Sequence, residues 1–192
     1  MKNDIIKKII IDYLEIFPSE NKRLEQLINY INNTEDNLTC DWNNKLGHLT
    51  AGSFIYSTST KRFLMIWHND LQMYLYPGGH CESKHESTLE TAISEVVEET
   101  GITDFSIKSL IDFNKSVPID IDIHSIPYNS RVGMPEHLHF DFRYVFIVDQ
   151  EYSVKIDKHE IGNFKWVDEQ ELAQDETYAF ILKKIKTYMN LT

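Results

Sequence analysis

The chain has 192 residues, with 30 acidic and 19 basic side chains, so its formal net charge is −11. This length corresponds to one domain, with or without a small appendage, that can bury a substantial apolar core. The apolar fraction of 42% excludes intrinsic disorder, and the acidic excess argues against nucleic acid or an anionic membrane as a partner. A small phosphorylated substrate stays open, provided that metal ions neutralise the charge.

Two cysteines, Cys40 and Cys81, stand outside any CxxC spacing, so we expect reduced thiols in a cytoplasmic protein. Apolar runs stay shorter than the roughly 18 residues of a membrane span. Charged residues interrupt the apolar residues at the start of the chain, which does not resemble a secretory signal. No membrane partner is expected.

The first 45 residues are predicted to form a helical extension. Apolar residues recur at helical spacing from Ile5 to Leu14, and again from Leu24 to Ile31. Pro18 interrupts the pattern, and we expect the next residue, Ser19, to be the N-cap of the second helix. The sequence leaves three roles open for these helices, which are a packing layer, a lid and an arm that forms a homodimer.

Strand and helix patterns alternate over the remainder of the chain. Alternation of apolar and polar residues and short apolar runs predict strands over residues 49–57, 62–67, 72–76, 117–123, 138–146 and 165–167. The helical period predicts helices over residues 87–100 and 177–190, the second with an apolar side formed by Phe180, Ile181, Ile185 and Met189. This order predicts an α/β (α+β) domain over residues 46–192, in which a mixed sheet lies between helices.

The predicted helix over residues 87–100 carries the strongest chemical signal. Glu95, Glu98 and Glu99 fall on one face of it because they are spaced i, i+3 and i+4. No Lys or Arg lies between Lys84 and Lys108, and residues 82–104 hold seven acidic side chains against one basic side chain. Carboxylates grouped in this way either face open water or act as hard oxygen ligands for Mg²⁺ or Mn²⁺.

The ends of this helix are defined by local signals. Ser87 with Glu90 forms a capping box at its start, and Gly101 stands at the position after its last residue where glycine is preferred. The segment from Gly79 to Ile102 resembles the signature of the Nudix hydrolases, G-x5-E-x7-R-E-U-x-E-E-x-G-U, where U is a bulky aliphatic residue. The match is closest over residues 95–102.

The segment departs from the family signature at two places. One extra residue stands between Gly79 and Glu86, and Ser94 replaces the arginine that braces the glutamates in the family. Similarity extends to residues 47–51, 74–80, 137–143, 166–167 and 171–172, which are similar to a branch of Nudix proteins with an N-terminal helical extension. The resemblance covers residues 46–192. It implies a Nudix-type α/β/α sandwich preceded by the short helical extension of residues 1–45.

The resemblance implies a metal-dependent hydrolase that cleaves a pyrophosphate bond in a nucleoside diphosphate-linked small molecule. Glu95, Glu98 and Glu99 are then the catalytic residues, and one of them, or a glutamate from a distant loop, takes a proton from water. The implied ligands of Mg²⁺ or Mn²⁺ are these three residues and Glu82, with Glu86 as a further outer candidate. The substrate-binding candidates are Gly78, Gly79, His80, His137, His139 and Arg143.

Several further side chains have both a functional and a structural interpretation. His137, His139, Asp141 and Arg143 share one strand face, which is a substrate-pocket wall, a second metal-binding feature or an ordinary polar surface. His48 and His80 are ligands or hydrogen-bonded structural residues. Aromatic side chains that either stack on a base or pack in the sheet are Trp67, Tyr74, Tyr76 and Tyr128. Glu160 is a distant candidate for metal or base chemistry.

Two other functions remain compatible with the sequence. Ser94 and the extra loop residue also fit a catalytically weak Nudix-fold sensor that binds a nucleotide or an ADP-ribose-like ligand. Retention of all three helix glutamates favours the enzyme. An isomerase acting on a prenyl diphosphate is less favoured, because Cys40 precedes the first predicted strand of the sheet.

Overall fold

The computed structural model describes residues 1–107, 117–128, 130, 133–155 and 161–189. Its strands are β1 (Gly47–Ser57), β2 (Arg62–His68), β3 (Met73–Leu75), β4 (Gly78–His80), β5 (Ser106–Ile107), β6 (Asp120–Ile126), β7 (His137–Val148) and β8 (Ile161–Val167). Its helices are α1 (Asn3–Ile16), α2 (Glu25–Asn33), α3 (Thr88–Thr100), α4 (Glu169–Leu172) and α5 (Glu176–Met189), with short 3₁₀ turns η1 (Pro18–Glu20) and η2 (Asp36–Leu38).

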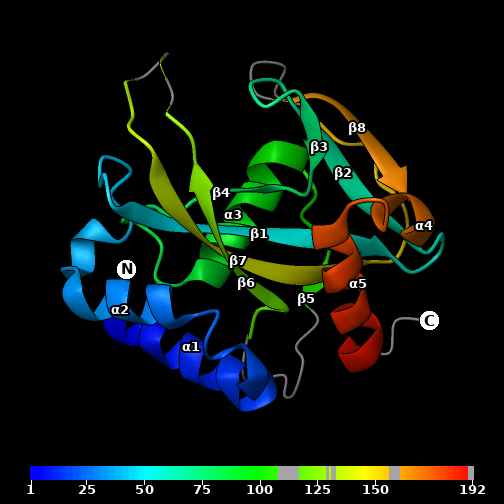
Figure 1. Cartoon of the computed structure of the whole chain (residues 1–192). Helices are drawn as coiled ribbons and strands as arrows, with labels where there is room; N and C mark the ends of the chain where they lie inside the picture. The colour runs from blue at the N-terminus through cyan, green and yellow to red at the C-terminus, as the bar shows by residue number, and fades with distance from the viewer. Residues whose placement is uncertain (108–116, 129, 131–132, 156–160, 190–192) are drawn as a thin grey trace.

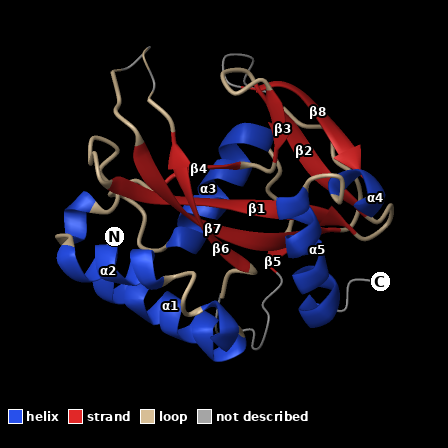
Figure 2. Cartoon of the chain, in the orientation of Figure 1, coloured by secondary structure: helices blue, strands red, loops and turns tan. Residues whose placement is uncertain are grey.

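The strands form one mixed sheet, as the sequence predicts. Strands β1 and β7 run parallel at its centre, in a register that pairs Gly47 with Leu138 and Ser57 with Val148. The other strand pairs are antiparallel. Figure 1 shows α3 behind the sheet and α5 in front of it, and Figure 2 shows the same layers by type of element. The α/β/α sandwich is therefore confirmed.

The two N-terminal helices pack onto the sheet domain and share its apolar core. Ile6, Tyr13, Leu24 and Leu27 are fully buried. This burial gives the helices the role of a packing layer, while a homodimer through them stays a prediction. The expected cap is wrong, because Ser19 lies in η1 and α2 follows Leu24 without a side-chain cap.

Strand β4 was missed by the sequence patterns because glycines disfavour strands. It pairs with β1 through Ala51 and Gly79. A Cβ added to Gly52 would lie 2.6 Å from the carbonyl oxygen of Pro77, and one added to Gly78 would lie 2.8 Å from the Cα of Gly52. Glycine is needed here because the two backbones approach so closely.

Two other expectations differ from the structure. Strand β8 starts at Ile161, four residues before the predicted segment. Phe180 is 48% exposed rather than packed, whereas Lys184 on the same helix is 6% exposed. The helix is turned so that this lysine contacts the partly buried Glu20 and the buried Asp120. Glu160 lies outside the described residues.

Among the helices of the described part, none combines the length and apolar character that a membrane span requires.

Candidate metal centre and the polar face of the sheet

The sequence of α3 sets both of its ends and its buried side. The Ser87 hydroxyl accepts a hydrogen bond from the Glu90 N–H at 3.2 Å, so the predicted N-cap is confirmed. Gly101 ends the helix with a φ of 69°, a left-handed conformation that glycine adopts without strain. Ala92 and Val96 are fully buried in the core that α3 shares with the sheet. The opposite side of α3 is therefore fixed relative to the sheet.

The three glutamates of this side are each held by a local contact. Glu99 is 8% exposed, and its Oε2 accepts a hydrogen bond from the Gly78 N–H at 2.8 Å. The carboxylate of Glu95 lies against Gly79, where an added Cβ would be 2.6 Å from Glu95 Oε1. Glu98 is exposed. Its Oε1 accepts a hydrogen bond from the Ser94 hydroxyl at 2.7 Å.

The loop before α3 adds one carboxylate to this group. Glu82 is exposed and pairs with Lys84 at 3.1 Å. The hydrogen bond with Glu82 raises the pKa of the Lys84 ammonium, and the charges of Glu98 and Glu95 raise it further. A cation near these side chains is therefore stabilised by several carboxylates at once.

The donor set fits the divalent metal that the family implies. The groups that face outward are carboxylate oxygens, which Mg²⁺ and Mn²⁺ prefer over nitrogen or sulfur. Gly79 contributes space because its missing Cβ leaves room for the Glu95 carboxylate. Gly78 and Gly79, predicted to bind substrate, thus contact the glutamates directly.

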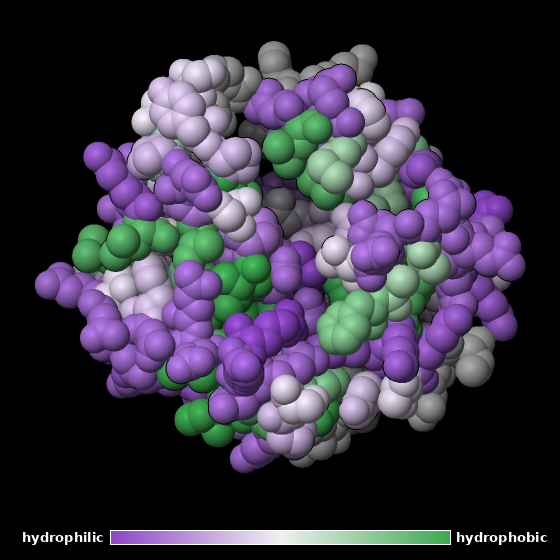
Figure 3. Space-filling model, viewed as in Figure 1, coloured by the Kyte–Doolittle hydropathy of each residue, from purple (hydrophilic) through white to green (hydrophobic). Residues whose placement is uncertain are grey.

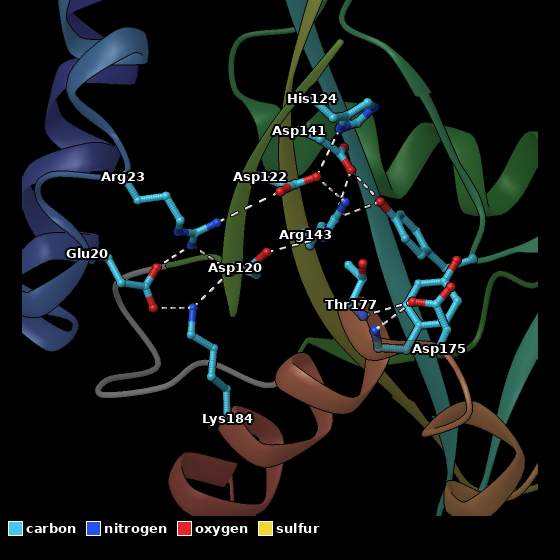
Figure 4. A network of polar contacts seen from close by, with 12 residues as sticks. Glu20, Arg23, Asp120, Asp122, His124, Asp141, Arg143, Asp175, Thr177 and Lys184 are labelled. Carbon is cyan, nitrogen blue, oxygen red and sulfur yellow. Dashed lines mark hydrogen bonds and ion pairs between the residues drawn. The ribbon is translucent and has the colours of Figure 1, made fainter. Parts of the chain in front are cut away.

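The front face of the sheet carries a second group of polar residues, drawn in Figure 4. Arg143 lies at its centre with 5% exposure. Its guanidinium donates hydrogen bonds to Asp141 at 2.9 Å, to Asp122 at 2.8 Å and to Asp120 at 3.3 Å. Arg143 was predicted to bind substrate, but it is buried and already engaged by three carboxylates. Its observed contacts hold strands β6 and β7 together.

The same ionic network reaches the N-terminal helices and α5. Asp120 accepts hydrogen bonds from Arg23 and Lys184, both at 2.9 Å. Lys184 also pairs with Glu20 at 2.7 Å. Burial would raise the pKa of Asp122, but the hydrogen bond with His124 and the charge of Arg143 outweigh it and lower the pKa to about 2. The carboxyl group of Asp122 is therefore ionised at neutral pH.

Three histidines from three strands meet beside this network. His48 of β1, His80 of β4 and His139 of β7 each offer a ring nitrogen, and these atoms lie within 4.8 Å of one another. The Nε2 atoms of His48 and His139 are 3.1 Å apart. His124 and His137 pack their rings against that of His139. The sequence named four of these residues as candidates, and the sheet register brings them together.

The rings of His48 and His139 are neutral at physiological pH. Burial, helped by the charges of His80 and His137, lowers the pKa of His48 to about 4. Burial and neighbouring histidines lower the pKa of His139 to about 2. The pKa of His80 is also lowered, first by partial desolvation of its ring and then by the charge of His137, although the residue as a whole is exposed. A neutral imidazole has a lone pair on one nitrogen and can therefore accept a proton or bind a metal.

The aromatic candidates have different surroundings. Tyr76 donates a hydrogen bond to Asp141 and accepts one from Arg143, so it belongs to the ionic network. Trp67 and Tyr74 pack edge to face. Tyr128 is 64% exposed. Figure 3 shows a hollow on this side of the molecule, between the β6–β7 strands and the β2–β3 strands.

This chain has a mixed sheet between helices, and a helix that carries carboxylates packs against a strand with two glycines. These features are typical of Nudix-fold proteins. A family model described as NUDIX domain matches residues 47–188. The chain belongs to the Nudix family.

One relative supports this membership, and two solved structures share the fold. A protein of Lactococcus lactis named probable DHNTP pyrophosphohydrolase is 30% identical over 152 residues, which cover 79% of this chain and 82% of the relative. The structure of the dihydroneopterin triphosphate pyrophosphohydrolase of E. coli matches with a TM-score of 0.53 at 19% identity, covering 74% of this chain and 95% of the other. The NUDIX domain of Shewanella oneidensis NrtR, in complex with ADP ribose, matches with a TM-score of 0.51 at 13% identity, covering 86% and 98%.

Proposed function

We propose that this chain is a pyrophosphohydrolase that depends on a divalent metal bound by Glu95, Glu98 and Glu99, with Glu82 as an outer ligand. The observation that carries the proposal is that the carboxylates of Glu95, Glu98 and Glu99 are each positioned by a contact of their own. Gly78 orients Glu99, Gly79 makes room for Glu95 and Ser94 orients Glu98. Ser94 thus supplies a brace at the position of the family arginine.

Bound Mg²⁺ or Mn²⁺ supplies positive charge that offsets the charge of a pyrophosphate and makes water more acidic. The protein's own contribution is to place carboxylates on a rigid helix and to keep them fixed. Glu98 is the most exposed of Glu95, Glu98 and Glu99, so its carboxylate is the one best placed to accept a proton from a water molecule. Positioning and electrostatic stabilisation account for most of the catalysis of phosphoryl transfer.

We propose a small molecule that carries a chain of phosphates on a ring system as the substrate. The relative named as a probable DHNTP pyrophosphohydrolase makes dihydroneopterin triphosphate the first compound to test. Nucleoside diphosphate derivatives such as ADP-ribose are the second group. The free thiols Cys40 and Cys81 suit a cytoplasmic location for such an enzyme.

The direct test is to incubate the protein with Mg²⁺ and each of these compounds, and to measure the release of pyrophosphate, and of phosphate after treatment of the products with a phosphatase. We expect release that depends on the metal and stops when EDTA is added. Ligand-induced increases in melting temperature without any release of phosphate would contradict the enzyme and favour the sensor. Omission of Mg²⁺ from the wild-type reaction is the control for hydrolysis that does not depend on the metal.

A further inference from the structure

The histidines on the front face of the sheet form a cluster that the proposed hydrolysis does not use. His48 and His139 are direct partners in the register of the parallel strands β1 and β7. His80 pairs with Thr50, two residues beyond His48 on the same side of β1. Three neighbouring strands therefore each place one imidazole at the same end of the sheet.

The spacing of the ring nitrogens suits a metal ion. Two nitrogens bound to one tetrahedral Zn²⁺ at about 2.0–2.1 Å lie about 3.4 Å apart. The Nε2 atoms of His48 and His139 are 3.1 Å apart, a distance that an N–H···N hydrogen bond would also give. The third histidine favours a metal site over a simple hydrogen bond, because a ring nitrogen of His80 lies within 4.8 Å of the ring nitrogens of His48 and His139. His80 is exposed, so its side chain has room to turn toward the other two.

The surroundings of the cluster also suit a bound cation. His137 donates a hydrogen bond from Nδ1 to the carbonyl oxygen of Pro135 at 2.8 Å, and His124 pairs with Asp122 at 2.9 Å. Carboxylates and carbonyls of this kind orient imidazoles around metals. The adjoining ionic network has an excess of one negative charge, since it contains four carboxylates and three cations, namely Glu20, Asp120, Asp122, Asp141, Arg23, Arg143 and Lys184.

We propose that His48, His80 and His139 bind a transition-metal ion of the zinc class, with a fourth position open for an oxygen ligand. Imidazole nitrogen suits Zn²⁺, whereas the carboxylates of α3 suit Mg²⁺. The two sites therefore select different metals, although His80 directly follows the Gly78–Gly79 pair that contacts Glu99 and Glu95. Three protein ligands and one open position are the arrangement of zinc sites that bind a further ligand.

The test measures metal binding rather than hydrolysis, so it is independent of the proposed function. The background is the double variant Glu95→Gln/Glu98→Gln, which weakens binding at the α3 carboxylates. After treatment with a chelator, this variant is titrated with Zn²⁺ by calorimetry, and bound zinc is counted by atomic emission. We expect one Zn²⁺ per chain. No stoichiometric binding by this variant would overturn the proposal.

Single substitutions in this background locate the metal. His80→Ala changes an exposed side chain, so the fold should be retained, and the affinity for Zn²⁺ should fall at least about tenfold. His139→Asn should cause a similar loss, and His68→Ala on β2 is the matched control that should change nothing. Unchanged affinity in His80→Ala and His139→Asn would contradict the assignment. A melting curve of each variant separates loss of a ligand from loss of the fold.

A nuclear magnetic resonance experiment gives an independent measurement on the unmodified protein. Zn²⁺ should shift the ring signals of His48, His80 and His139. The ring of the buried His85, which contacts Thr91 on the side of α3, should stay unchanged. Zinc-induced shifts confined to other histidines would overturn the proposed site.

Discussion

The acidic face of α3 and the polar face of the sheet are both rich in carboxylates, but their charges are balanced in opposite ways. Glu95, Glu98 and Glu99 come from one helix turn and lack a basic residue nearby in the sequence. On the sheet, Arg143 is surrounded by carboxylates that come from strands β6 and β7. We propose that the first group binds a metal cation from solution, whereas the second group is neutralised largely by the protein itself.

This difference predicts that the sheet network contributes mainly to stability and the α3 glutamates mainly to activity. Buried charges are expensive to remove from water and are tolerated only when their partners remain in place. Carboxylates of like charge three or four residues apart weaken a helix by only a few tenths of a kcal/mol per pair, so a protein can keep them for chemistry. We therefore expect substitutions in the sheet network to reduce stability first. Substitutions around α3 should reduce turnover first.

The largest effect on stability is expected from Arg143→Gln. This change leaves Asp120, Asp122 and Asp141 without their shared guanidinium, so the free energy of unfolding should fall by about 3–5 kcal/mol. Urea denaturation measures the change. Arg62→Gln is the matched control, because Arg62 is half exposed and its pair with Glu151 spans 3.8 Å. An exposed pair of this kind contributes less than about 1 kcal/mol. Equal losses in the two variants would contradict the role of the buried network.

Acid should weaken the same network. The pKa of Asp122 is about 2 in the folded protein, below the ordinary value of 3.8, so its ionised form stabilises the fold above about pH 4. This contribution, about 2 kcal/mol, is lost as the pH falls from about 4 to 2. Urea denaturation over this range should show a shallower decline for Asp122→Asn than for the wild type. Identical declines would count against the ionised pairing of Asp122.

A smaller effect, limited to catalysis, is expected from Gly79→Ala. The new Cβ would lie 2.6 Å from Glu95 Oε1, so the carboxylate must move away. Since the displaced atoms end a flexible side chain, the melting temperature should change little. Turnover should fall about tenfold, which corresponds to about 1.4 kcal/mol in the barrier. The Mg²⁺ concentration that gives half of the maximal activity should also be higher in this variant than in the wild type. A normal kcat with a normal Mg²⁺ requirement would show that the position of Glu95 is unimportant.

The smallest effect is expected from Ser94→Ala. This change removes the hydrogen bond to Glu98, and one such bond contributes about 0.5–1.5 kcal/mol. We expect kcat to fall between about twofold and tenfold. Ser83→Ala, in the exposed loop before α3, is the matched control and should leave kcat unchanged. Equal kcat values for Ser94→Ala and the wild type would remove Ser94 from its bracing role.

The α3 region could be predicted from the sequence because its signals are local. Ser87 and Gly101 mark the ends of the helix within a few residues, and the glutamates share a face through helical spacing alone. The family resemblance then gave the fold of the remaining chain. The alternation of residues 137–143 also predicted which side chains share a strand face, and the structure confirms that placement.

The sheet network could not be predicted because its members meet only after folding. Asp120 and Lys184 are 64 residues apart in the chain, and no local pattern links them. Lys184 lies between buried apolar residues of α5, where a lysine is normally expected to turn outward. Strand β4 was missed for a related reason, since its glycines are explained only by their contact with β1.

The proposal that the α3 carboxylates form the catalytic metal centre is tested most directly by Glu98→Gln. Glutamine keeps the size of the side chain and removes its charge. Hydrolysis of the best substrate with Mg²⁺ should fall at least about 100-fold, about 2.7 kcal/mol in the barrier, while the melting temperature stays within a few degrees of the wild type. Undiminished turnover by a folded Glu98→Gln variant would contradict the assignment.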